Sequence, residues 1–189
     1  MPLRFVDSNV LFRMFAASPA KIKQYQETGA CGNESLDYAI DLLLRLGEGG
    51  YSTSELALLE TVSVASRLGG QWKAETLFGA VIAQESFQIL ETKALAYPLS
   101  FAFTLENQLE ARDSLHLAVA TLSGVNAIIT SDTKFADSIE SMTKHVVQRG
   151  FRLPTSVRGV YRLTRKQASI IEEQVTPRLS ILSVDRAPA

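Results

Sequence analysis

Cysteine and histidine are scarce in this sequence. Its 189 residues include one cysteine, Cys31, and two histidines. A single cysteine excludes an internal disulfide and a zinc site built from several cysteines, and two histidines argue against a histidine-rich catalytic zinc centre. Zinc sites of these two kinds are therefore not expected.

Long apolar runs are also missing. Residues such as Lys93, Pro98 and Glu106 interrupt each candidate before it reaches the roughly 20 apolar residues that span a bilayer. The first residues, MPLRFVDSN, lack the apolar core of a secretion signal. We therefore expect a cytoplasmic protein without a membrane-spanning segment. With 46% apolar and 21% charged residues, the composition is that of a globular protein and excludes collagen-like and wholly disordered chains.

Neither charge is in excess overall, but the two charges are unevenly distributed. Residues 1–148 carry 11 basic and 17 acidic side chains, a net charge of −6, whereas residues 149–189 carry 8 and 3, a net charge of +5. A basic segment of this kind indicates a nucleic-acid or membrane partner, or merely a solvated face. Its candidate phosphate contacts, which are equally candidates for docking an acidic protein, are Arg149, Arg152, Arg158, Arg162, Arg165 and Lys166.

Short apolar runs alternate with helical patterns along the chain. Strands are predicted at 3–6, 51–53, 87–90, 126–130 and 145–147. Helices are predicted from residue 10, over 34–46, 55–68 and 71–84, twice within 93–122, and over 136–142, with a polar loop over 17–33. Strands that alternate with helices predict an α/β fold whose central sheet is mostly parallel and covered by helices on both faces.

The pattern changes after Gly150. The capping-box signature Thr164-x-x-Gln167 predicts a helix to about Val175. We therefore expect a core domain over residues 1–148 and a basic C-terminal extension over 149–189, packed on the core or appended to it, and not a second domain.

Two acids, Asp7 and Asp132, directly follow predicted strands. Ligands of an open parallel sheet bind beyond the carboxyl ends of the strands, where the strand order reverses. Neither a GxGxxG nor a GxxxxGK[ST] motif follows Val6, so a dinucleotide site or a P-loop is not expected. The acids themselves are the candidate functional groups.

Neighbouring carboxylates repel one another unless a divalent cation neutralises them. Oxygen ligands suit Mg²⁺ or Mn²⁺, which also keep waters and substrate phosphate oxygens as ligands. Such an ion can activate a water and stabilise the leaving oxygen of a phosphodiester, and two ions about 4 Å apart can do so together. Acids clustered at this edge of the sheet therefore predict phosphodiester hydrolysis.

Two further acids lie on helices in apolar surroundings. Glu60 occurs in LALLETVSVA, and Asp113 immediately precedes the apolar run SLHLAVATL. Glu55 has a structural explanation, as the partner of Ser52 in a capping box. His116, three residues after Asp113, is expected to be a core residue with a satisfied ring and not a general base.

The motifs FVDSN, YSTSELALLE, DSLHLAVA and ITSDTKF carry a resemblance to the PIN-domain family, which includes the toxins of VapBC-type toxin–antitoxin pairs. The resemblance covers residues 1 to about 148 and implies a three-layer α/β/α sandwich. It implies that one or two Mg²⁺ or Mn²⁺ ions bind four catalytic acids that serve RNA cleavage: Asp7, Glu60, Asp113 and Asp132.

Other side chains are candidates for supporting these acids. By the resemblance, Ser8 and Asn9 follow the first acid and Ser131 precedes the fourth, where each would position an acid, a metal-bound water or the substrate. Asp137 lies about one helical turn beyond Asp132 and is either a further site acid or a solvated residue. We also expect RNA as the substrate, a cognate antitoxin as a candidate partner, and a homodimer.

Each acid taken alone also has a structural explanation. Asp7 and Asp113 could cap the helices that follow them, Asp132 could close a turn, and Glu60 could be solvated or paired with Arg67. The four acids lie 53, 53 and 19 residues apart, each at the element that the resemblance implies. This joint pattern favours a shared metal site.

Three functions follow from these observations. The first is a metal-dependent endoribonuclease, the toxin of a toxin–antitoxin pair. The second is a non-catalytic member of the same fold that binds RNA or a protein through its C-terminal extension. The third, a haloacid-dehalogenase-like phosphatase, is disfavoured because that chemistry needs a second aspartate two residues after the first, where this chain has Asn9. The long 17–33 stretch and the basic extension leave the RNA target and the partner undetermined.

Overall fold

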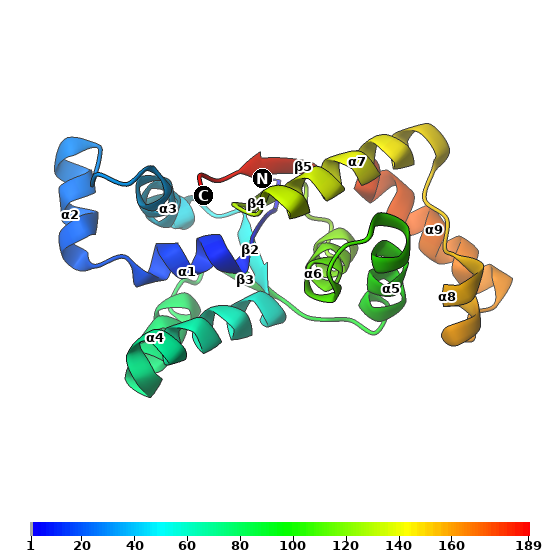
Figure 1. Cartoon of the computed structure of the whole chain (residues 1–189), viewed down its shortest axis with the longest axis horizontal. Helices are drawn as coiled ribbons and strands as arrows, with labels where there is room; N and C mark the ends of the chain where they lie inside the picture. Colours follow the sequence, from blue (N-terminus) through cyan, green and yellow to red (C-terminus); the bar gives the residue numbers. More distant parts are fainter. Residues whose placement is uncertain (1) are drawn as a thin grey trace.

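The chain folds around a parallel sheet of five strands (Figure 1), described here from a computed structural model. The structure describes residues 2–189, so Met1, the first residue of the expected core domain, lies outside the described residues. The strands are β1 (Arg4–Val6), β2 (Tyr51–Ser54), β3 (Phe87–Leu90), β4 (Ala127–Thr130) and β5 (Ser183–Arg186). Their order is β3-β2-β1-β4-β5, and every neighbouring pair is parallel. The predicted α/β class with a parallel sheet is confirmed.

Helices fill the connections between the strands. They are α1 (Ser8–Ala16), α2 (Pro19–Thr28), α3 (Glu34–Arg45), the short 3₁₀ helix η1 (Leu46–Glu48), α4 (Glu55–Ile82), α5 (Ala96–Asn107), α6 (Ala111–Leu122), α7 (Thr133–Arg149), α8 (Thr155–Val160) and α9 (Arg165–Ser180). The backbone of α4 is interrupted at Gly70, whose φ of 74° only glycine adopts readily. This is the position at which the sequence predicts one helix to end and the next to begin. None of the described helices has the length and apolar character needed to cross a membrane.

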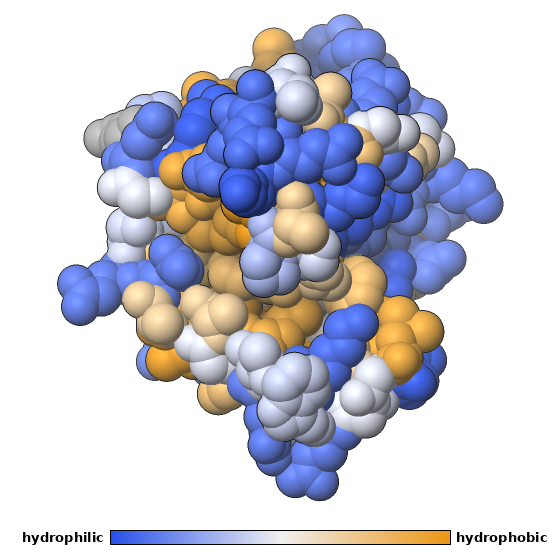
Figure 2. Space-filling view, turned by 90° about the vertical axis from the view of Figure 1, so that its left-hand side faces the viewer, coloured by the Kyte–Doolittle hydropathy of each residue, from blue (hydrophilic) through white to orange (hydrophobic). Residues whose placement is uncertain are grey.

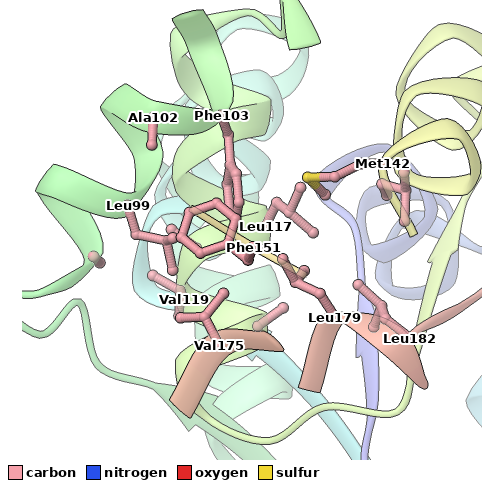
Figure 3. Close-up of a cluster of buried hydrophobic side chains, with 14 of the residues drawn as sticks. Leu99, Ala102, Phe103, Leu117, Val119, Met142, Phe151, Val175, Leu179 and Leu182 are labelled. Carbon is pink, nitrogen blue, oxygen red and sulfur yellow. The ribbon is translucent and has the colours of Figure 1, made fainter. Parts of the chain in front are cut away.

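Two hydrophobic clusters lie on opposite faces of the sheet. Successive residues of a strand point to opposite faces, so Phe5 and Ile128 join one cluster while Val6 and Ile129 join the other. The first cluster packs α5, α6, α7 and α9 against the sheet, and Figure 3 shows part of it around Phe103, with the Phe151 ring 5.8 Å away. The second cluster packs α1, α3 and α4. The result is the expected three-layer α/β/α arrangement.

The segment after residue 148 contributes to both the sheet and the core. β5 pairs with β4 along its whole length, from Ala127 opposite Ser183 to Thr130 opposite Arg186. Val175 and Leu179 of α9 are completely buried in the first cluster. Arg178 donates hydrogen bonds to the carbonyl oxygens of Thr121 and Leu122, at the end of α6. Part of the positive charge of this segment therefore holds the fold together.

Several local predictions are wrong, for physical reasons. Residues 145–147 are not a strand but belong to α7, because the apolar residues Phe135, Ile139, Met142 and Val146 follow a helical spacing that continues through them. The 17–33 loop contains α2, which Ser18 caps. The strand β5 and the helix α8 were not foreseen.

The capping box predicted at the start of α4 is also wrong. Ser54, not Ser52, is the N-cap and accepts from the backbone N–H of Ala57 at 3.1 Å. Glu55 accepts instead from the backbone N–H of Thr92. The capping box at Thr164 and Gln167 is confirmed, and the helix it opens runs on past Val175 to Ser180.

Truncation of Leu179 tests the role of the C-terminal segment in the core. We expect Leu179→Ala to lower the free energy of unfolding by about 2–5 kcal/mol, because it leaves a cavity among completely buried side chains. Ile181→Ala is the matched control, since Ile181 is 63% exposed two residues further on. Urea denaturation of both variants measures the difference. Equal, small effects would show that the segment does not stabilise the core.

Candidate active site

The carboxyl ends of β1 and β4 lie side by side at the point where the strand order reverses. Val6 at the end of β1 is opposite Ile129 of β4, and the backbone N–H of Asp7 donates to the carbonyl oxygen of Ile129 at 3.0 Å. Asp7 and Asp132 therefore leave the sheet at the same edge. Open parallel sheets bind their ligands at this place.

Asp7 is buried at the start of α1, and both of its carboxylate oxygens accept hydrogen bonds. Oδ1 accepts from the backbone N–H of Ser8 and Oδ2 accepts from the Thr130 hydroxyl, each at 2.7 Å. Asp7 is thus the N-cap of α1, as one of the structural explanations expects. This role leaves lone pairs on both oxygens, so the cap does not prevent a further interaction.

Thr130 links the first acid to the fourth. Its hydroxyl donates to Asp7 and accepts from the backbone N–H of Asp132 at 3.0 Å. Asp132 in turn caps α7 by accepting from the backbone N–H of Phe135 at 3.0 Å. Sequence reasoning proposed Ser131 as the positioning hydroxyl and missed Thr130. The available signal was a hydroxyl residue at the end of the apolar strand AIIT, whose four residues are all buried.

Glu60 projects from α4 and contacts His116 of α6. Its Oε2 atom lies 3.2 Å from Nε2 of His116, and its side chain is 21% exposed. Burial by itself raises the pKa of Glu60, but the hydrogen bond with His116 opposes this rise, and Ser8 and Arg112 add to the opposition. The net effect is a pKa below the usual value for glutamate, so Glu60 is ionised at neutral pH.

Asp113 lies in the first turn of α6 and is 8% exposed. Burial is the largest cause that raises its pKa; Arg112 opposes the rise, and repulsion from Asp7 and Asp132 adds to it. Asp7 and Asp132 are therefore near enough to influence Asp113. Arg112 is the adjacent cation, with its Nε atom 3.3 Å from Oδ1 of Asp113 and 3.7 Å from Oε1 of Glu60. This arginine joins the helical glutamate to the aspartates electrostatically.

A groove of about 560 Å³ opens beside these acids, between α1, α4 and the start of α6. Its polar lining includes Ser8, Asn9 and Glu60 together with three arginines, and the complete lining is Ser8, Asn9, Phe12, Arg13, Leu59, Glu60, Thr61, Ser63, Val64, Arg67 and Arg112. Arg13 is held in place by a hydrogen bond of 2.9 Å from its Nη1 atom to the carbonyl oxygen of Pro188. The groove therefore combines one acid with several cations and apolar side chains.

The face of the molecule that includes α4 also exposes hydrophobic residues. Figure 2 shows hydrophobic residues across the middle of this face, where the surface is hollowed, and hydrophilic residues above them. The exposed large apolar side chains of α4 are Leu59, Leu68, Trp72, Phe78 and Ile82. Exposed apolar side chains that gather on one face are typical of interaction sites.

The donor set fits a hard divalent cation by its chemistry. It consists of carboxylates, two of them buried, and the side-chain oxygen of Asn9, which is buried and has no hydrogen-bond partner among residues 2–189. A buried oxygen without a partner is uncommon in proteins and indicates a missing water or ion. Within the same residues, however, no three Asp, Glu, His or Cys side chains converge tightly enough to form a ready-made metal cluster.

The remaining predicted residues lie elsewhere or have other contacts. Asp137 is exposed on α7 and pairs with Arg186 at 2.7 Å. Arg152 pairs with Glu172 at 2.9 Å, and the other basic residues of the extension are exposed or half-buried: Arg149, Arg158, Arg162, Arg165 and Lys166. Figure 1 places α8 and the start of α9 at the opposite end of the molecule from α4. The structure therefore places Asp7 and Asp132 within electrostatic range of Asp113, and Arg112 contacts both Asp113 and Glu60, whereas Asp137 pairs elsewhere.

The family model described as PIN domain matches residues 4–138. No curated protein matches the sequence. Among solved structures, a toxin–antitoxin complex from Klebsiella pneumoniae is 19% identical and has a TM-score of 0.43, with 69% of this chain and 88% of that chain covered.

Two further solved structures match a similar share of this chain. The Mycobacterium tuberculosis toxin VapC20, which cleaves the sarcin–ricin loop, is 15% identical with a TM-score of 0.49, with 71% of this chain and 94% of that chain covered. VapBC2 from Rickettsia felis, bound to a DNA fragment from its promoter, is 14% identical with a TM-score of 0.49, with 70% and 90% covered.

Replacement of Asp113 tests whether its buried charge lowers the stability of the folded protein. Because burial raises the pKa of Asp113 in the folded protein, its ionised form opposes folding at any pH above the unfolded-state pKa. In metal-free buffer at about pH 7, we therefore expect Asp113→Asn to increase the melting temperature. At about pH 3 the carboxyl is protonated in the folded protein, and the difference should largely disappear.

Asp41→Asn is the control for this experiment. Asp41 is a partly exposed aspartate on α3 that pairs with Arg45, so its replacement removes a favourable contact and no buried charge. Thermal unfolding of both variants at the two pH values gives the comparison. A melting temperature of Asp113→Asn at or below the wild-type value at neutral pH would contradict the interpretation.

Proposed function

The chain belongs to the PIN-domain family, and from this premise we propose that it is a divalent-metal-dependent endoribonuclease that hydrolyses RNA phosphodiester bonds. The observation that carries the proposal is that the buried carboxyl of Asp113 lies near enough to Asp7 and Asp132, beside the switch point of the parallel sheet, for both to add to the rise of its pKa, after the larger effect of burial. Neighbouring carboxylates of this kind favour the binding of a cation, which removes their repulsion. A cation held by carboxylates is suited to phosphate chemistry.

The residues proposed to hold the cation are Asp7, Asp113, Asp132 and Glu60. When bound, one or two Mg²⁺ or Mn²⁺ ions would lower the pKa of a water and neutralise charge on the phosphodiester. Thr130 keeps Asp7 and Asp132 in place by bonding to both. Asn9 supplies a neutral oxygen at the rim of the groove.

The protein's own cations have a separate part in the proposed reaction. Arg112 lies at the junction of the acids and the groove, where its guanidinium can pair with a phosphate oxygen of the scissile group. Arg67 and Arg13 also line the groove, and they suit the phosphates on either side of the scissile one. The arrangement promotes reaction by positioning the strand and stabilising charge, and it needs no protein nucleophile.

Partners and surroundings form part of the same proposal. The exposed apolar side chains of α4 suit a protein partner, for which we propose a cognate antitoxin or the second subunit of a homodimer. The basic residues of the C-terminal extension remain a second candidate for phosphate contact. We propose a cytoplasmic location.

Binding without catalysis, through the C-terminal extension, is the second candidate function. The observation that favours it is that the described acids do not converge into a ready-made cluster and that Arg112 already compensates two of them. The two functions differ in their response to metal, because only the first requires that Mn²⁺ or Mg²⁺ binds the acids.

The first test of the proposal is cleavage of mixed RNA with and without Mn²⁺. We expect wild-type cleavage to depend on the metal, and Asp7→Asn and Asp113→Asn to abolish it while leaving the circular dichroism spectrum unchanged. Removal of a catalytic carboxylate that acts as a metal ligand should cost at least about 100-fold in rate.

Asp41→Asn is again the control and should cleave like the wild type, because Asp41 pairs with Arg45 on α3. Mn²⁺ should also raise the melting temperature of the wild type and of the control more than that of Asp113→Asn. Full cleavage by both Asp7→Asn and Asp113→Asn would refute the assignment of the site.

A second test locates the phosphate contacts of the RNA. If the strand lies in the groove, Arg67→Gln should weaken RNA binding and reduce the slope of log affinity against log salt concentration by about 0.7. Lys166→Gln, which changes an exposed cation of the extension, is the comparison. Fluorescence anisotropy with catalytically inactive protein measures both. An effect of Lys166→Gln without one of Arg67→Gln would assign the contacts to the extension.

A further inference from the structure

A buried chain of hydrogen bonds leads from the start of α4 to Glu60. The backbone N–H of Ala57 donates to Oγ of Ser54 at 3.1 Å, Oγ of Ser54 lies 3.0 Å from Nδ1 of His116, and Nε2 of His116 lies 3.2 Å from Oε2 of Glu60. Ser54 is completely buried, and His116 is 1% exposed. The chain connects the strand end of β2, the helix α6 and the acid of α4.

The hydrogen-bond partners determine the direction of the chain. Because the Glu60 carboxylate only accepts, Nε2 of His116 carries a hydrogen and donates it to Oε2. In the neutral imidazole Nδ1 then has no hydrogen and accepts from the hydroxyl of Ser54, whose oxygen also accepts from the N–H of Ala57. The other neutral tautomer would place two acceptors, Nε2 and Oε2, against each other.

Packing holds the imidazole in this position. The ring lies beside Phe5 of β1, with the ring centroids 5.8 Å apart and the planes inclined at 47°. His116 is also one of the buried residues of α6, and its neighbour Leu117 is completely buried in the core. A ring enclosed in this way and bonded at both nitrogens has little freedom to turn.

We propose that His116 is a positioning residue that fixes the orientation of the Glu60 carboxylate at the edge of the groove. The consequence for RNA cleavage rests on the proposed function, whereas the fixed orientation itself does not. With Oε2 bonded to His116, Oε1 is directed to the side of Arg112, 3.7 Å from its Nε atom. His116 does not reach the substrate, because it is buried and both ring nitrogens already have partners. Ser54 acts through His116 by bonding to Nδ1 and so holding the ring.

The test combines spectroscopy, structure and kinetics. In the wild type, a long-range proton–nitrogen correlation spectrum of the imidazoles should show His116 with its hydrogen on Nε2. Crystal structures of His116→Leu and His116→Gln should show Glu60 displaced in the first variant and close to its wild-type orientation in the second, since the glutamine amide can replace the Nε2 donor. These two readouts do not depend on RNA cleavage.

The kinetic expectation follows from the loss of orientation. For His116→Leu we expect kcat to fall about 10- to 100-fold with little change in KM, and His116→Gln to recover much of the loss. Thr121→Val is the control for disturbance of α6, because the buried Thr121 hydroxyl bonds only to the carbonyl oxygen of Leu117 on the same helix. This control should keep wild-type kcat.

Ser54→Ala provides a second route if His116→Leu does not fold. It removes the hydroxyl that bonds Nδ1 and should therefore change the chemical shift of Nδ1 in the His116 spectrum, while the Glu60 carboxylate keeps the hydrogen on Nε2. Thr164→Ala, which removes the N-cap of α9 instead, should leave that spectrum unchanged. A hydrogen on Nδ1 in the wild type, or an unchanged Glu60 orientation in His116→Leu, would overturn the inference. Absence of cleavage by the wild type would overturn the proposed nuclease function and leave the positioning role to the two structural readouts.

Discussion

Repulsion between carboxylates at the carboxyl edge of a parallel sheet is the constraint that the rest of the structure serves. Asp7 and Asp113 are both buried, and Asp7 and Asp132 both raise the pKa of Asp113. Water, which would screen these charges at an exposed surface, is largely excluded from them. The fold tolerates the arrangement because each carboxylate has a hydrogen-bond donor or a cation beside it: the Thr130 hydroxyl donates to Asp7, the backbone N–H of Phe135 donates to Asp132, and Arg112 lies beside Asp113.

The topology explains why these acids meet. β1 is central, and the chain adds β2 and β3 on one side of it before returning to place β4 and β5 on the other. The helices that follow β1 and β4 therefore leave in opposite directions, and the space between their first turns stays open for ligands. α4 and α6 approach this space from the two faces of the sheet. Arg112 of α6 joins Glu60 of α4 to Asp113, and His116 of the same helix bonds to Glu60.

The basic extension has two kinds of positive charge. Arg178 contacts the end of α6, Arg186 pairs with Asp137 and Glu140 within α7, and Arg152 compensates Glu172, so these cations have structural partners. Others, such as Arg165, are exposed. The charge difference between the two parts of the sequence therefore arises partly from the contacts that attach β5 and α9 to an acidic core. Only the exposed cations remain candidates for phosphate contact.

The sequence by itself determined the class of fold and pointed to the four acids that are proposed to form the site. Alternation of apolar runs predicted the parallel sheet, because the periods of strands and helices are visible in the order of residues. The sequence also showed that Asp7 and Asp132 follow strands, since local apolar runs end there. The strand predicted at residues 145–147 is wrong. The β-branched side chains favour a strand locally, but the burial of Val146 on the inner face of α7 outweighs this local preference.

Only the tertiary structure decided what surrounds the acids. The contact between His116 and Glu60 spans 56 positions in the chain, that between Thr130 and Asp7 spans 123, and β5 joins the sheet from the far end of the sequence. No local pattern encodes such contacts, because they depend on which helices pack on which face of the sheet. For the same reason His116, expected as a satisfied core residue, is indeed buried and bonded, and one of its two partners is a residue of the proposed site.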